Sequence, residues 1–294
     1  DSNIDQNSIQ GSINGILDDI NKQMSTYDSN SEISTFNAIP EDSLILVSDD
    51  FYHVLVKSKY YYDISNGQFD VTVDNLSSIW GFGETDFIKP LIEVIDSVLD
   101  ITGFDKIDLL GENIISKKNS KVKINLNAIA KGYALDKISK YFDDSNINDY
   151  MIEIGGEVKV KGKNSKGTKW TIAISSPNNG TKDYLDLIYL NNGSMATSGD
   201  YKNFIIHDTT SYSHIINPVT GYPAANNVVS ATVISEDCID ADALATILNV
   251  MHVSEGVKLI NNLDAVECFI VVSDKGEINY YYSNNMKDYF NQDY

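Results

Sequence analysis

The stretch MIEIGGEVKVK, residues 151–161, sets two short runs of alternating apolar and polar residues on either side of a glycine pair. Alternation with a period of two is typical of strands that bury one face, and a glycine pair suits the turn between them. Similar runs recur toward the C-terminus, and we expect strands over residues 151–154, 157–161, 170–175, 185–190, 204–207, 213–216, 229–234, 269–272 and 278–282. The second half of the chain is therefore predicted to be rich in antiparallel sheet.

The first half of the chain has helical patterns instead. Apolar residues recur at steps of three and four from Ile9 to Met24, which predicts an amphipathic helix. Further helices are expected over residues 48–65, 90–100, 131–142, 240–251 and 254–262, and short strands over residues 69–73 and 122–126. Pro90 suits the first turn of its helix. Because helices and strands are partly segregated, the predicted class is α+β, a single unit in which a helix-rich portion (1–149) and a β-rich portion (150–294) associate closely.

The composition limits the kind of ligand that the protein can bind. The chain of 294 residues has 42 Asp and Glu against 22 basic residues, all of them Lys, and a net charge of −20. A hydrophobic fraction of 42% is that of a globular protein. The negative charge would repel a phosphate backbone, so we exclude nucleic-acid binding. A phosphate-bearing ligand would need local compensation from Lys, a helix N-terminus, a backbone nest or a bound cation.

Two further classes are excluded by what the sequence lacks. No apolar run approaches the roughly 18 residues of a membrane-spanning helix. The two cysteines, Cys238 and Cys268, form no CxxC pair, and no His lies near them at metal-binding spacing. This pattern excludes a disulfide framework and a structural zinc site. Two buried free thiols are the favoured interpretation, and a single Cys238–Cys268 bridge stays open.

The segment DADALAT, residues 240–246, carries the densest group of possible metal ligands. Asp242 and Thr246 are four residues apart, so a helix would place a carboxylate and a hydroxyl on one face, one turn from each other. Two hard oxygen ligands suit Mg²⁺, which takes its remaining ligands from water and substrate phosphates. The same pattern would also arise from an acidic first turn that complements the helix dipole, with Thr246 bonded to a backbone carbonyl.

Two other segments carry candidate residues. Lys131 lies at the start of a predicted helix in NAIAKGYALD (127–136), where backbone N–H groups and an ammonium could face a diphosphate. His214 comes just before the glycine-bearing turn NPVTGYP (217–223). A solvated lysine and a solvent-facing strand histidine are the alternative interpretations.

Seven segments, taken in order, resemble the ApbE family, whose members are FAD:protein FMN transferases. They are MSTYDSNSEIS (24–34), NGQFDVTV (66–73) followed by WGFG (80–83), NAIAKGYALD (127–136), IEIGGEVKVKG (152–162), MATSGDYKNF (195–204), HIINPVTGYP (214–223) and DADALAT (240–246). The resemblance implies a T-fold-like core with antiparallel sheets and flanking helices. It also implies Mg²⁺-dependent transfer of FMN from FAD onto a Thr or Ser hydroxyl of a target protein, through a phosphoester bond and with release of AMP.

The resemblance also implies roles for individual residues. Asp242, Thr246 and the carbonyl of Ala128 would bind Mg²⁺, and His214, Asp242 and Lys131 would serve catalysis. The residues implied in flavin or nucleotide binding are Met24, Tyr27, Gln68, Phe69, Asp70, Asn125, Lys131 and Ile216. Asn125 stands where the family often has Asp.

The implied partners are FAD and an acceptor protein, expected to be an electron-transfer protein of a bacterial membrane. The implied location is extracytoplasmic, as a membrane-anchored lipoprotein. Two alternatives use the same residues: a Mg²⁺-dependent FAD pyrophosphatase that yields FMN and AMP, and a flavin-binding protein without turnover.

Overall fold

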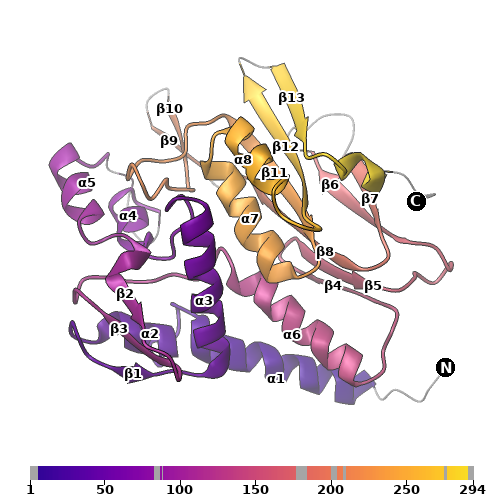
Figure 1. The fold of residues 1–294 in the computed structure, drawn as a ribbon, viewed down its shortest axis with the longest axis horizontal. Helices are drawn as coiled ribbons and strands as arrows, with labels where there is room; N and C mark the ends of the chain where they lie inside the picture. The colour runs from indigo at the N-terminus through magenta and orange to yellow at the C-terminus, as the bar shows by residue number, and fades with distance from the viewer. Residues whose placement is uncertain are drawn as a thin grey trace.

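A computed structural model describes residues 6–82, 87, 89–176, 184–199, 204–207, 210–274 and 277–290 (Figure 1). The α-helices of these residues are α1 (Gln6–Met24), α2 (Glu32–Ala38), α3 (Asp49–Ile64), α4 (Asp74–Ile79), α5 (Ile92–Leu99), α6 (Ala130–Asp144), α7 (Cys238–Val250) and α8 (Val253–Ile260). Two 3₁₀ turns are η1 (Phe104–Lys106) and η2 (Met286–Phe290). None of the described helices combines the length and apolar character needed to cross a bilayer.

The strands of the described residues are β1 (Ile45–Leu46), β2 (Ile107–Leu109), β3 (Ile114–Lys117), β4 (Tyr150–Ile154), β5 (Glu157–Lys161), β6 (Trp170–Ser175), β7 (Tyr184–Leu190), β8 (Gly193–Gly199), β9 (Phe204–His207), β10 (Thr210–Ser213), β11 (Val228–Ser235), β12 (Glu267–Asp274) and β13 (Glu277–Tyr282). The main sheet has the order β13-β12-β11-β8-β5-β4, with every neighbouring pair antiparallel. Helices and antiparallel sheets together confirm the α+β prediction.

The two faces of the main sheet bury different cores. In β12, Cys268 and Ile270 pack into one core, whereas Phe269 and Val271 pack into another. The first core lies under the helices and the second under the hairpin β6–β7 and η2. This arrangement follows from the alternation of side chains along a strand. The protein is therefore layered as helices, sheet and hairpin.

Helix α7 occupies the middle of the molecule (Figure 1). It packs against β8 and β11 of the sheet and against α6, which itself contacts β4 and β5. The same core also takes residues from the N-terminal helices, such as Phe36 and Leu55. A smaller cluster of Leu76, Trp80, Ile95 and Ile216 packs α4 and α5 against the segment after β10. The two portions of the chain thus meet on either side of α7.

Two predicted strands are wrong. Residues 69–73 form turns, because the buried Asp70 carboxylate accepts the N–H of Thr72 and turns the backbone into α4. Residues 122–126 alternate between buried and exposed positions as a strand would, but they pair with no strand within the described residues. The side chain of Asn37 makes both hydrogen bonds to the backbone of Ile124 instead.

Other differences concern boundaries and elements for which the sequence analysis made no prediction, namely α2, α4, β1, β2, β3 and β8. β10 ends at Ser213, where the strand was expected to begin, and Pro90 precedes α5 instead of lying in its first turn. The unexpected strand β8 lies between β5 and β11. Cys238 and Cys268 are free and buried, which confirms the favoured interpretation of the two thiols. Gly83 and residues 200–203 of the quoted segments lie outside the described residues.

Candidate functional site

A cleft of ≈ 450 Å³ lies between the N-terminal helices and α7. Its lining includes eleven of the twelve residues proposed from the sequence: Tyr27, Gln68, Phe69, Asp70, Asn125, Ala128, Lys131, His214, Ile216, Asp242 and Thr246. The remaining one, Met24, is the last residue of α1 and is 4% exposed in the main core. Residues without a predicted role also line the cleft, among them Asp74, Ser77, Glu157 and Ser198.

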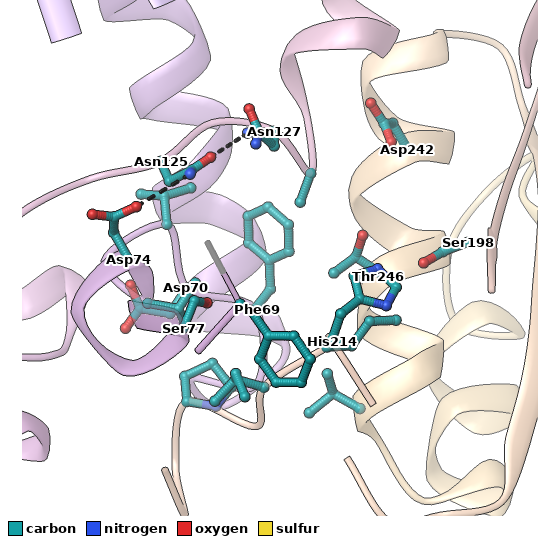
Figure 2. Close-up of a pocket in the computed structure, with 18 of the residues that line it drawn as sticks. Phe69, Asp70, Asp74, Ser77, Asn125, Asn127, Ser198, His214, Asp242 and Thr246 are labelled. Atoms are coloured by element: carbon teal, nitrogen blue, oxygen red, sulfur yellow. Dashed lines mark hydrogen bonds between the residues drawn. The ribbon is translucent and has the colours of Figure 1, made fainter. Parts of the chain in front are cut away.

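Helix α7 presents Asp242 and Thr246 to the cleft, one turn apart (Figure 2). Its N-terminus is held by α6. The carboxylate of Asp136, on α6, accepts the N–H groups of Cys238 and Ile239, each at 2.9 Å. These N–H groups have no acceptor within α7 because they belong to its first turn. Lys159 donates to the same carboxylate at 2.8 Å, so Asp136 is both a cap and an ion-pair partner.

A residue of α7 in turn caps the first turn of α6. The N–H of Gly132, in the first turn of α6, donates to Oδ2 of Asp242 at 2.9 Å. A Cβ on Gly132 would overlap the carbonyl of Cys238 and lie 2.8 Å from the Cα of Ile239. Only glycine therefore permits this close approach. Each helix supplies a carboxylate that caps the other, and this reciprocal capping fixes the orientation of Asp242.

Asp242 is 5% exposed, and burial raises its pKa to about 7. Lys131 opposes this shift, whereas the nearby Glu157 carboxylate adds to it. For Lys131, burial lowers the pKa but the Asp242 and Glu157 carboxylates raise it more, so that the net shift is upward. The cluster therefore holds two buried acids around one ammonium, a local excess of negative charge.

Glu157 begins β5, directly after the Gly155–Gly156 turn, and is 3% exposed. Its Oε1 accepts a hydrogen bond from Nζ of Lys131 at 2.5 Å. Its Oε2 is buried and has no hydrogen-bond partner among the described residues. A sequence signal for this residue existed only in the glycine turn before it.

The opposite wall of the cleft is also acidic. Oδ1 of the buried Asp70 accepts the N–H of Thr72 at 2.8 Å and its hydroxyl at 2.7 Å. Burial raises the pKa of Asp70 to about 6, although the bonds from Thr72 lower it. Asn125 donates to Oδ1 of Asp74 at 3.3 Å and accepts the N–H of Asn127 at 2.9 Å (Figure 2). The amide of Asn125 thus donates where an aspartate could not.

Aromatic surface is available at the cleft as well. Tyr27, on the loop after α1, lines the cleft and is 91% exposed, whereas Phe69 is buried. An exposed ring beside a cleft offers a face on which a flat heterocycle can stack.

The residues present fit a magnesium ion. Within the described ranges, no group of three or more His, Cys, Asp and Glu side chains has a metal-binding arrangement. Mg²⁺ does not require such a group, because it keeps several waters and binds through one or two protein oxygens plus substrate phosphates. The Asp242 carboxylate, the Thr246 hydroxyl and the Ala128 carbonyl are hard oxygen donors at the cleft. The unpartnered Oε2 of Glu157 adds negative charge that a bound cation would compensate.

This fold and this cleft define the chain as a member of the ApbE family, whose sequence profile matches residues 2–270. A FAD:protein FMN transferase from Vibrio cholerae is 36% identical over 274 residues, covering 92% of this chain and 82% of the relative. Another from Haemophilus influenzae is 34% identical, covering 90% of this chain and 78% of the relative.

Solved structures agree with this assignment. The structure of the flavin transferase ApbE from Vibrio cholerae has a TM-score of 0.89 and 34% identity, covering 97% of this chain and 91% of that one. The ApbE protein from Thermotoga maritima has a TM-score of 0.88 and 31% identity, covering 99% and 94%.

Proposed function

We propose that this protein transfers FMN from FAD onto a Thr or Ser hydroxyl of an acceptor protein, with Mg²⁺ as cofactor. The observation that carries the proposal is the cleft, where Asp242 and Thr246 of α7 face Lys131 and Glu157. The names of the relatives support the same reaction. The reaction breaks the diphosphate bond of FAD and forms a phosphoester to the acceptor, and AMP leaves.

The residues of the cleft divide the work of binding this substrate. Asp242, Thr246 and the Ala128 carbonyl would hold Mg²⁺, which supplies positive charge against the diphosphate oxygens. Lys131 binds the diphosphate in a protein that otherwise repels anions, since its net charge is −20. Tyr27 offers its exposed ring for stacking on one of the two heterocycles of FAD.

Proton transfer requires a group outside α6 and α7. The attacking hydroxyl must lose its proton as the new phosphorus–oxygen bond forms. We assign this role to His214, which lines the cleft on the segment after β10. Phosphoryl transfer otherwise requires positioning and charge stabilisation, which the buried groups on α6 and α7 supply.

The test is to incubate the protein with FAD, Mg²⁺ and a peptide that carries an acceptor threonine. Transfer predicts a mass gain of one FMN unit on the peptide and an equal amount of AMP. Release of AMP and free FMN regardless of the peptide would replace the proposal with FAD pyrophosphatase activity. FAD that stays intact for hours would indicate a flavin-binding protein without turnover.

We also propose, on the family resemblance, that the protein works outside the bacterial cytoplasm on an electron-transfer protein of the membrane. Fractionation of the native bacterium and detection of FMN-modified proteins in its membrane test this part. A cytoplasmic pool of the protein, with no modified membrane protein, would contradict it.

A further inference from the structure

We propose that Glu157 is a positioning residue of this site. One of its carboxylate oxygens holds Lys131, and the other accepts a hydrogen bond from a water ligand of the cation bound on α7. This inference rests on the proposed function, because it assumes the cation site of Asp242 and Thr246.

The two oxygens of Glu157 have different surroundings. Oε1 is paired with Lys131, whereas the buried Oε2 has no partner in the described part of the chain. An unsatisfied buried acceptor costs free energy, and the cost is larger for a charged group. Glu157 also lines the cleft, so a ligand there can reach it. A hydrogen-bond donor delivered with the ligand would remove this cost.

The backbone before Glu157 keeps space open beside Oε2. Gly155 and Gly156 have φ values of +65° and +109°, in a region that favours glycine. A Cβ on Gly155 would lie 3.5 Å from Oε2, in ordinary contact with it. The absence of a side chain at Gly155 therefore leaves space next to the unpartnered oxygen, and Gly155 itself lines the cleft.

The charge and chemistry of the site point to a water on a cation as the donor. The carboxylates of Glu157 and Asp242 exceed Lys131 by one negative charge, which favours a cation over a neutral ligand. Mg²⁺ retains several waters when it binds protein, and these waters are strong hydrogen-bond donors. Residues that bond to the ligands of a metal commonly contribute 10–100-fold to affinity or activity.

The substitution Glu157→Gln tests the inference. The amide oxygen can still accept from Lys131, but the amide nitrogen donates where Oε2 accepts. We expect the Mg²⁺ concentration for half-maximal turnover to rise roughly 10-fold. FAD binding without Mg²⁺, measured by flavin fluorescence, should tighten, because the cleft loses a negative charge. The matched control is Glu153→Gln, an exposed residue of β4 on the same hairpin, which should change neither quantity.

Each outcome either supports or overturns the proposed role of Glu157. A Mg²⁺ requirement in Glu157→Gln equal to that of the wild type would overturn the inference while leaving the proposed function in place. A wild type whose FAD turnover does not respond to Mg²⁺ would overturn both. If Glu157→Gln melts early, Glu157→Asp provides the second variant: it keeps the charge but withdraws the carboxylate, and the inference requires a raised Mg²⁺ requirement there as well.

Discussion

The carboxylate of Asp242 has two proposed roles, as a cap of α6 and as a ligand of a cation. Oδ2 caps α6 through Gly132, which leaves the other oxygen for a cation in the cleft. The substitution Asp242→Asn separates the two roles, because an amide oxygen can still accept the N–H. We expect turnover to fall by roughly 100-fold or more, because removal of a ligand should cost at least as much as the 10–100-fold typical of residues that only bond to a metal's ligands. The melting temperature should be unchanged or higher, since a buried charge is removed.

The matched control for this substitution is Asp240→Asn, on the same helix. Asp240 pairs with Lys57, and it does not line the cleft. Turnover should stay at the wild-type level. Steady-state assays at saturating FAD and Mg²⁺, with thermal melts of both variants, check the pair; wild-type turnover in Asp242→Asn would refute the metal role.

Asp70 should make stability depend on pH. Its pKa is raised from 3.8 to about 6 in the folded protein, chiefly by burial. Between these values the folded state binds more protons than the unfolded state, so the contribution of Asp70 to stability falls as pH rises from about 4 to 6 and is constant above. The variant Asp70→Asn keeps the acceptor for Thr72 but cannot titrate.

The free energy of unfolding of Asp70→Asn, relative to the wild type, should therefore increase by roughly 2.5 kcal/mol between pH 4 and pH 7. Urea titrations at these two pH values measure the difference. An identical pH dependence in both proteins would mean that Asp70 titrates normally.

The site residues that could be predicted from the sequence have partners nearby along the chain, and those that could not have partners far away along the chain. Asp242 and Thr246 could be paired from spacing alone, because a helix fixes the geometry of residues four apart. Glu157 and Asp136 could not, because their partners lie 26 and 102 residues away along the chain. Met24 was assigned to flavin or nucleotide binding from its place in a motif, but it belongs to the apolar face of α1 and packs into the main core.

At the scale of elements, the close approach of α6 and α7 organises the site. The substitution Gly132→Ala tests it, because the new methyl group would meet the backbone of α7 at Cys238. Overpacking against backbone that cannot rotate away should destabilise the protein by roughly 1–3 kcal/mol. It should also weaken the Mg²⁺ response, because the helices must separate and Asp242 moves with α7.

The matched control is Gly15→Ala, in the exposed face of α1, where a Cβ would meet nothing within 4 Å. This variant should gain about 0.5–1 kcal/mol, the usual advantage of alanine within a helix. Chemical denaturation of both variants gives the comparison. A neutral Gly132→Ala would show that the two helices can adjust at little cost.

Elements with a local signal could be predicted, and those held by distant partners could not. α3 follows Ser48, whose side chain caps it as an N-cap serine does. β8, with the sequence GSMATSG, has little apolar alternation, and it is a strand because β5 and β11 pair with both its edges. Residues 122–126 show the opposite case. Their side chains alternate as in a strand, but the side chain of Asn37, and not a neighbouring strand, makes hydrogen bonds to the backbone of Ile124.

The whole molecule should unfold as one unit. The main core combines residues of the helix-rich portion with those of the main sheet, and the smaller cluster joins Trp80 to Ile216. Trp80 also donates from Nε1 to the carbonyl of Gly221 at 2.8 Å. Neither portion can therefore lose its packing without exposing apolar surface of the other, which predicts a single cooperative transition.

The chain carries two tryptophans, one in each portion, and they report on this prediction separately. Trp80 is buried in the cluster of α4 and α5, whereas Trp170 packs on the core beneath β6–β7. Each variant, Trp80→Phe and Trp170→Phe, retains one of them. In each variant the fluorescence transition should coincide with that of circular dichroism, whatever the substitution costs in stability. A Trp80 transition that precedes the loss of secondary structure would mean that α4 and α5 unfold independently of the sheet.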